Sequence, residues 1–264
     1  ILTKASNGAS DFGNKFGQPL ICGSVLTFEH EGKADEPTYG FDKVIMLAGG
    51  VGYARRSDAQ KGTPEPGEEV VLLGGDNYRI GMGGGAVSSV NTGQYAGAIE
   101  LNAVQRSNPE MQKRVENVIR TLSESEDNPI ISIHDHGAGG HLNCLSELVE
   151  TTGGHFDLSA FPIGDETLSS KEIIGNESQE RMGLLVKGDA VERIARIAER
   201  ERAPMYVVGR TTDDMHLTFE EAGGDKPIDL ALSDMFGSAP KTYMVDKHID
   251  KTYPALSYVA ARFE

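Results

Sequence analysis

Residues 176–182 carry the most informative chemistry of this chain. Glu177, Ser178 and Gln179 present a carboxylate, a hydroxyl and a carboxamide in succession, directly before an apolar run. Such a cluster can hold a polar small molecule from several directions, because each group offers a different set of donors and acceptors. Taken alone, the same triplet could simply cap a turn, so its interpretation depends on the other motifs of the chain.

Asp135 follows the apolar residues 130–133 and precedes a run of glycines. A carboxylate at the end of a strand lies where α/β sheets present ligand-binding groups, and Mg²⁺ needs only one or two carboxylates when a phosphate supplies further oxygens. We therefore expect Asp135 to bind magnesium, with the N-cap of the following helix as a compatible alternative. His134 and His136 have the spacing of a metal pair, but no third soft ligand is near, so we interpret them as hydrogen-bonding or packing residues.

Residues 81–89 form a glycine loop that ends in two hydroxyl side chains. Its unobstructed N–H groups could hold a phosphate, and we take Gly83, Gly84 and Ser88 as candidate nucleotide-binding residues. The loop lacks the Gly-Lys-Ser/Thr ending of a P-loop. On its own, a tight and close-packed turn therefore explains it better.

The composition excludes several classes of function. The chain has a formal net charge of −15 and no cluster of Lys or Arg, so it lacks the basic surface of a nucleic-acid-binding protein. Two distant cysteines, Cys22 and Cys144, give neither a disulfide framework nor a zinc site. With no apolar run of about 20 residues and no secretion signal, we expect a cytoplasmic protein without membrane contact. The chain begins with Ile1, which suggests a fragment of a longer protein.

The hydrophobic pattern predicts an α/β (α+β) fold, in which helices cover one face of a mixed β-sheet. Helix signals are Asn108 followed by Pro109, the apolar spacing after residue 140, and a capping box of Asp189 with Glu192. The expected strands are residues 44–48, 70–73, 130–133, 156–158, 182–186, 205–208 and 215–219.

These motifs, in this order, resemble the family of phosphoribosylformylglycinamidine synthases, in its large single-chain form. The resemblance rests on residues 6–17, 45–52, 81–89, 104–111, 134–140 and 176–182. It implies the C-terminal-domain fold of the aminoimidazole ribonucleotide synthetase superfamily. Residues 1–40 would then be the tail of a preceding N-terminal-type domain, 41–224 the C-terminal-type domain, and 225–264 a linker or peripheral extension.

The resemblance also implies a reaction and its ligands. ATP activates the amide oxygen of formylglycinamide ribonucleotide, and ammonia from glutamine then gives the amidine, so the family is a magnesium-dependent ligase and glutamine amidotransferase of purine biosynthesis. Family positions that contact the ribonucleotide correspond to Gln105 and the Glu177, Ser178, Gln179 triplet. Asp135 corresponds to the magnesium ligand, and Gly23, Ser24 and Val25 to part of a nucleotide site.

The chain also departs from the family pattern. The catalytic His segment, the family's nucleotide-binding glycine loop and the glutaminase domain have no counterpart in it, so we assign no catalytic residue. None of His134, His136, His141 and His155 lies in the catalytic motif. We therefore expect the fragment alone to be inactive and to work with the remaining domains of its parent enzyme.

Two alternatives stay open. A related enzyme of the superfamily, such as selenophosphate synthetase, thiamine-monophosphate kinase or aminoimidazole ribonucleotide synthetase, would share the fold. A non-catalytic structural module, or one that holds an auxiliary nucleotide, would use the same glycine loops. Residues 177–182 favour the synthase over the related enzymes, whereas separate calorimetric titrations of substrate and ADP would distinguish it from the non-catalytic module.

Overall fold

A computed structural model of the protein describes residues 2–24, 26, 28–31, 37–40, 47–88, 90, 94–103, 108–178, 180–243, 245, 252 and 255. The strands of its main sheet are β3 (Glu69–Leu73), β4 (Ile130–Asp135), β5 (Gly154–Asp157), β6 (Met182–Val186), β7 (Met205–Thr211), β8 (His216–Glu220) and β9 (Ile228–Ala231). Their spatial order is β4-β6-β3-β7-β5-β8-β9. β5 and β8 are parallel and the other neighbours are antiparallel, so the sheet is mixed, as the sequence predicts.

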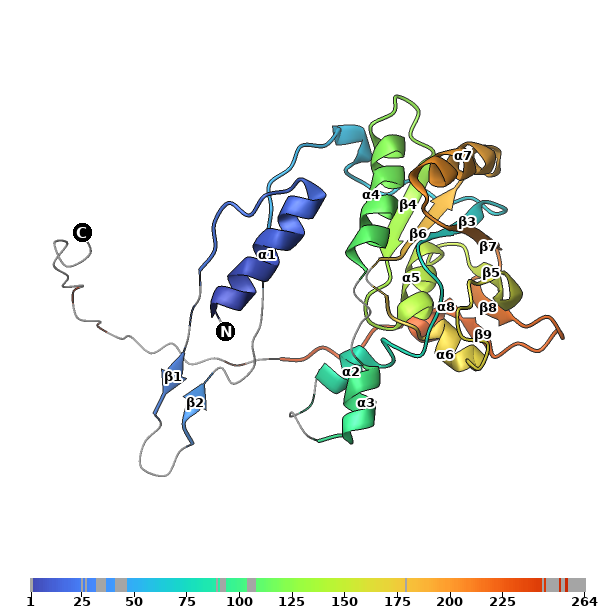
Figure 1. Ribbon diagram of the computed structural model, residues 1–264. Coiled ribbons are helices and arrows are strands. Elements are labelled where there is room, and N and C mark those ends of the chain that lie inside the picture. Colours follow the sequence, from blue (N-terminus) through green and yellow to red (C-terminus); the bar gives the residue numbers. More distant parts are fainter. Residues whose placement is uncertain are drawn as a thin grey trace.

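Helices pack on both faces of this sheet, and the expectation of one covered face is wrong. The helices of the body are α4 (Pro109–Ser123), α5 (Gly140–Leu148), α6 (Ser170–Ile174), α7 (Val191–Glu201) and α8 (Leu232–Met235). One core cluster joins Val71 and Leu73 of β3 to α4 and α7, and a second joins Val70 and Leu72 to α5 and α6. Successive strand residues face opposite sides of a sheet, so a run of consecutive apolar residues such as 70–73 needs a helix layer on each side (Figure 1).

Two elements begin where the sequence predicts. Asn108 caps α4, because its side-chain oxygen accepts from the N–H of Met111 at 3.1 Å. β6 spans Met182–Val186, as expected. The capping box of Asp189 and Glu192 is wrong, because a 3₁₀ turn, η3 (Gly188–Ala190), leads into α7 and no side chain caps that helix.

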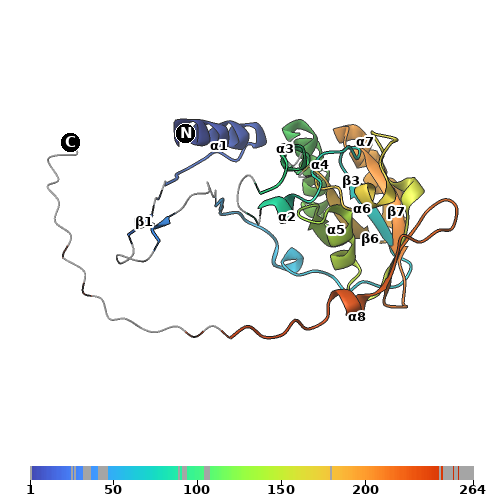
Figure 2. The same ribbon diagram turned by 90° about the horizontal axis from the view of Figure 1, so that it is seen from below.

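The N-terminal part of the chain lies outside the sheet body. It contains α1 (Leu2–Phe16), the two-stranded pair β1 (Glu29–His30) and β2 (Tyr39–Gly40), and the 3₁₀ helix η1 (Arg56–Asp58). Figures 1 and 2 both show α1 beside α4 and apart from the sheet. Most of the strand expected at residues 44–48 falls outside the described residues, and the described 47–50 have no regular structure.

Three short helices complete the body: α2 (Gly84–Ser88) and α3 (Gly97–Asn102) follow β3, and the 3₁₀ helix η2 (Leu158–Ala160) follows β5. The sheet continues past residue 224, where the sequence suggests that the domain ends, because β9 pairs with β8 as its edge strand. Among the described residues, no helix is long and apolar enough to cross a membrane.

Candidate functional site

The ends of two neighbouring strands bring the Asp135 loop next to residues 176–182. β4 ends at Asp135 and β6 begins at Met182, and these two residues are partners in the antiparallel register. Met82 of the glycine loop forms an isolated bridge with Asn176. The three segments that the sequence analysis selects therefore meet at one end of the sheet.

Glu177 connects these three segments. Its Oε1 accepts a hydrogen bond from the N–H of Gly139 at 3.1 Å, and its own N–H donates to the carbonyl of Gly81 at 3.0 Å. Glu177 is only 2% exposed, and Ser178 is fully buried. The first two members of the polar triplet thus lie inside the protein, where Glu177 holds two glycine-containing loops together.

The glycine loop packs closely against Glu177, as the interpretation of a tight turn predicts. Gly81 has φ = 76°, and a Cβ there would overlap the carbonyl of Glu177. A Cβ at Gly84, the first residue of α2, would come within 2.6 Å of Oε2 of Glu177. Gly83 differs, because a Cβ there would meet nothing within 4 Å. The open space at Gly83 is the part of the loop best suited to receive a ligand.

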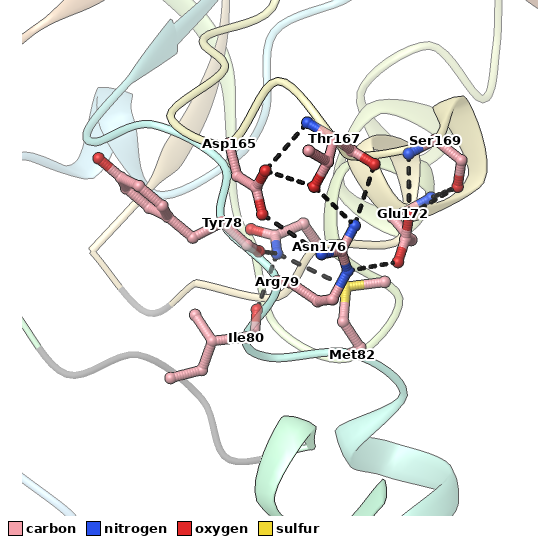
Figure 3. A network of polar contacts seen from close by, with 9 residues as sticks. All are labelled: Tyr78, Arg79, Ile80, Met82, Asp165, Thr167, Ser169, Glu172 and Asn176. Carbon is pink, nitrogen blue, oxygen red and sulfur yellow. Dashed lines mark hydrogen bonds and ion pairs between the residues drawn. The ribbon is translucent and has the colours of Figure 1, made fainter. Parts of the chain in front are cut away.

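Asn176 fixes the irregular segment, residues 77–80, that leads into this loop. Its Nδ2 donates to the carbonyl of Tyr78 at 2.6 Å and to that of Ile80 at 2.7 Å. Figure 3 shows the carboxamide of Asn176 between these two carbonyl groups. One buried side chain therefore satisfies two backbone acceptors immediately before Gly81.

Arg79 ties the same segment to α6 and to the loop before it (Figure 3). Its Nε donates to Glu172 at 3.0 Å, and its other nitrogens reach Asp165 and Thr167. The hydrogen bond from Arg79 is the main cause that lowers the pKa of Glu172 to about 2, and hydrogen bonds from Ser169 add to it. Ser169 and Glu172 also form the capping box of α6.

Arg181 is a fully buried cation behind the site. Its Nη2 donates to the carbonyl oxygen of Asn176 at 2.9 Å and to Oδ1 of the same residue at 2.5 Å. Its Nη1 lies 2.9 Å from Nε2 of His141 and donates to Oδ1 of Asn77. Burial of a charge is costly unless hydrogen bonds compensate for it. These contacts supply that compensation.

His136 and His141 continue this network. Nε2 of His136 lies 2.9 Å from Nδ1 of His141. Burial is the main cause that lowers the pKa of both imidazoles well below the ordinary value, and the positive charge of Arg181 lowers both further. Both side chains are therefore neutral near pH 7. The role expected for His136, in hydrogen bonding and packing, is confirmed.

Asp135 itself is open to solvent, with a side chain 71% exposed. It does not cap α5, because the N-cap residue of that helix is Gly139; the helix-cap alternative is wrong. Nε2 of His134 lies 2.5 Å from Oε2 of Glu147, whereas His136 contacts His141, so the two histidines do not form a metal pair. Within the described residues, no group of three or more His, Cys, Asp or Glu side chains could hold a metal ion. A magnesium ion at Asp135 would thus need oxygens from a ligand.

Several predicted site residues are not brought to this place. Gln105, Gln179 and Val25 lie outside the described residues, as does the side chain of Ser88. Gly23 and Ser24 are exposed in the irregular segment between α1 and β1. Both ribbon views show that segment apart from α2 (Figures 1 and 2).

The sequence analysis did not select Arg181, Asn77 or His141 as members of the site. One signal was present, because Arg181 lies two residues after the polar triplet and directly before the apolar residues 182–186, where a charge is unexpected. Asn77 is 104 residues away along the chain, so only the fold shows that the two meet.

A cavity of about 860 Å³ lies between α1, residues 53–58 and α4. Glu180 and Met182 form part of its lining, together with Phe12, Phe16 and Gln112. The far end of the polar segment 176–182 thus borders a space of the size that small-molecule ligands occupy.

Comparisons with known proteins give one family. Residues 65–221 match the family described as AIR synthase related protein, C-terminal domain. The chain is 41% identical over 254 residues to an Arabidopsis thaliana protein named probable phosphoribosylformylglycinamidine synthase, chloroplastic/mitochondrial, covering 91% of this chain and 18% of that protein. It is 40% identical over 259 residues to the Dictyostelium discoideum phosphoribosylformylglycinamidine synthase, covering 95% of this chain and 19% of that protein. The chain thus spans about a fifth of the length of these relatives.

Solved structures share the fold. Thermotoga maritima PurL complexed with FGAR superposes with a TM-score of 0.70 at 22% identity, covering 93% of this chain and 39% of that one. The same protein complexed with ATP gives a TM-score of 0.64 at 20% identity, covering 93% and 37%. The fold is therefore the mixed, helix-covered sheet that the sequence predicts. From the match over residues 65–221, the chain belongs to the family of AIR synthase related proteins, through their C-terminal domain.

Proposed function

We propose that this chain is part of a phosphoribosylformylglycinamidine synthase, a ligase that converts formylglycinamide ribonucleotide to formylglycinamidine ribonucleotide in purine biosynthesis. The two curated relatives that carry this name are 41% and 40% identical to it. One structural observation carries the proposal: Glu177 links the glycine loop, the Asp135 loop and residues 176–182. ATP and glutamine as co-substrates, and a glutaminase domain as partner, belong to the same proposal.

We assign the ribonucleotide to Gln105 and the triplet of Glu177, Ser178 and Gln179. The burial of Glu177 and Ser178 supports a division of labour within the triplet. Glu177 sets the relative position of the two loops, the buried Ser178 donates to Oδ1 of Asn176, and Gln179 is the member of the triplet that we expect to meet the ligand. Mostly uncharged hydrogen-bonding groups suit positioning, which supplies much of the rate in phosphoryl and acyl transfer.

Asp135 is the proposed magnesium ligand. Its exposed carboxylate at a strand end suits Mg²⁺, which prefers one or two carboxylates together with water and phosphate oxygens. Bound magnesium would neutralise the charge of the ATP phosphates. Gly83 and Gly84 offer backbone N–H groups in the glycine loop, which Glu177 joins to the loop after Asp135, and we extend the nucleotide assignment to Ser88 and to Gly23, Ser24 and Val25.

A change at Gln179 in the full-length protein tests the substrate assignment. Loss of one hydrogen-bonding partner from a polar site costs about 1–3 kcal/mol, so Gln179→Ala should weaken binding of formylglycinamide ribonucleotide about tenfold or more. The affinity for ATP should stay nearly unchanged. Calorimetric titration of each ligand separately measures both values, with Asn143→Ala on the exposed face of α5 as the control. An equal loss for ATP, or no loss for the ribonucleotide, would show that the triplet serves another ligand.

A non-catalytic module that holds an auxiliary nucleotide is the alternative. It is favoured by the small share of the relatives that the chain spans, 18% and 19%. For the same reason we expect turnover only from the full-length enzyme. Binding of ADP to the protein without any binding of the ribonucleotide would favour the module. We keep the cytoplasm as the proposed location, although the name of the plant relative gives chloroplast and mitochondrion.

A further inference from the structure

Arg181 reaches the glycine loop through a single intermediary, Asn176. Oδ1 and the carbonyl oxygen of Asn176 both accept from Nη2 of Arg181. The guanidinium of Arg181 can donate hydrogen bonds but cannot accept them, so the oxygen Oδ1 of Asn176 must face it. The Nδ2 group of Asn176 therefore faces the other way. There it donates to the carbonyls of Tyr78 and Ile80. The guanidinium therefore sets the orientation of the carboxamide.

The other half of the guanidinium holds the start of the segment that leads into the glycine loop, residues 77–80. Nη1 donates to Oδ1 of Asn77, and Nδ2 of Asn77 donates to the carbonyl of Pro162 at 2.8 Å. One planar group thus fixes residue 77 directly and residues 78–80 through Asn176. The glycine loop begins at the next residue, Gly81, whose carbonyl accepts the N–H of Glu177.

The choice of arginine follows from this geometry. Its fork presents donors in two directions at fixed angles, whereas a lysine ammonium is a point charge on a flexible stem. Charge-assisted hydrogen bonds are also stronger than neutral ones. Arg181 and its partners Asn77, Asn176 and His141 are fully buried, so solvent does not reach them to replace a lost contact.

We propose that Arg181 is a positioning residue of the ligand site: by orienting Asn176 it holds the glycine loop and Glu177 in the arrangement that receives the phosphate-bearing ligand. This proposal rests on the function proposed above. It extends the site from the residues that face the ligand to a buried layer behind them, formed by Asn77, Asn176 and Arg181.

Asn176→Asp in the full-length protein separates positioning from simple stabilisation. An aspartate still accepts from Arg181, but it cannot donate to the carbonyls of Tyr78 and Ile80. Asn128→Asp is the matched control: it makes the same chemical change, and the contact that the structure shows for the Asn128 side chain, the N–H of Ile130 donating to Oδ1, is one that an aspartate retains.

Two readouts are needed. Hydrogen exchange of the N–H groups of Met82, Glu177 and Gly139 reports on the loops, and exchange in β6 reports on the core. We expect Asn176→Asp to speed exchange in the loops at least about tenfold while exchange in β6 is unchanged. We also expect KM for formylglycinamide ribonucleotide or ATP to rise about tenfold, with a smaller change in kcat. The control should change neither.

Four outcomes are decisive. Unchanged loop exchange in Asn176→Asp would overturn the proposal, and so would a change in β6 equal to that in the loops. If Asn176→Asp does not fold, Arg181→Lys is compared with Arg181→Met. A positioning role predicts that the loop amides are better protected from exchange in Arg181→Lys than in Arg181→Met. Equal protection in the two variants would overturn the proposal. Faster loop exchange in a protein that never turns over the ribonucleotide would refute the proposed function but leave the positioning role intact.

Discussion

His141 is a buried residue whose pKa depends on the positive charge beside it. His141 is fully buried and lies 2.9 Å from both Arg181 and His136. Burial lowers its pKa, and the positive charge of Arg181 lowers it further. Protonation of His141 would place a second positive charge in the same network. The folded protein therefore keeps this side chain neutral.

This lowered pKa predicts a loss of stability in acid. In the unfolded chain His141 takes up a proton near its ordinary pKa of about 6.5, whereas the folded protein resists protonation. Above about pH 6.5 the two states bind equal numbers of protons at this site, and below it unfolding is favoured by up to about 1.4 kcal/mol per pH unit. The free energy of unfolding, measured in urea at several pH values below 6.5, should fall less steeply with decreasing pH in His141→Gln than in the wild type. Equal slopes in the two proteins would contradict the prediction.

Residues such as Arg181 mark the limit of what the sequence alone could show. The segments that carry the site were identified from residue type and spacing, because glycines, carboxylates and hydroxyls near apolar runs are local signals. The partners of Arg181, in contrast, are separated from it by up to 104 residues. Whether a polar side chain is buried, and what it contacts, depends on tertiary packing that a single sequence does not encode locally.

At the scale of elements, the glycine loop depends on two glycines for different reasons. Gly81 and Gly83 both have a positive φ, 76° and 67°. A Cβ at Gly81 would overlap the carbonyl of Glu177, whereas a Cβ at Gly83 would meet nothing within 4 Å. The backbone strain of a substitution is therefore similar at the two positions, and the steric overlap is present only at the first.

This contrast gives a matched pair of variants. Gly83→Ala should cost about 1 kcal/mol, the typical penalty for a left-handed backbone conformation in a residue with a side chain. Gly81→Ala should cost at least about 1–3 kcal/mol more, because the loop must move away from Glu177 and the hydrogen bond between their backbones is weakened. The free energy of unfolding in urea measures both. Equal losses would show that the contact with Glu177 does not constrain the loop.

Elements that depend on local signals were predicted, and those that depend on packing were not. The Asn108 cap of α4 and the apolar run of β6 are complete in a few residues. The helix layer on the second face of the sheet was missed, because consecutive apolar residues such as 70–73 indicate a buried strand without saying what covers it. The start of α7 was misplaced because burial of Ile194 and Ala198, rather than a side-chain cap, stabilises that helix.

At the scale of the whole molecule, the chain consists of a well-packed body and a lightly attached N-terminal helix. The body contains the two core clusters, one on each face of the sheet. Helix α1 was not predicted from its glycine-containing sequence. Its link to the body is narrow: among the side chains of α1 that the structure describes, Phe16 is the only large apolar one that is buried, and Lys113 of α4 donates to the carbonyl of Phe16 at 3.2 Å.

This difference in packing predicts that α1 opens without unfolding of the body. Local opening requires little free energy where few apolar contacts are buried, so the amides of α1 in this chain should exchange at least about a hundredfold faster than those of β6. Phe16→Ala should accelerate exchange in α1 further, because it removes the main buried contact, and should leave β6 unchanged. Phe12→Ala is the control, since Phe12 is 44% exposed and stacks on Phe16 without being buried itself. Equal protection of α1 and β6 would mean that α1 opens only when the body unfolds. In that case α1 would be a permanent wall of the cavity that it lines together with Glu180 and Met182, and the cavity would not open by movement of α1 alone.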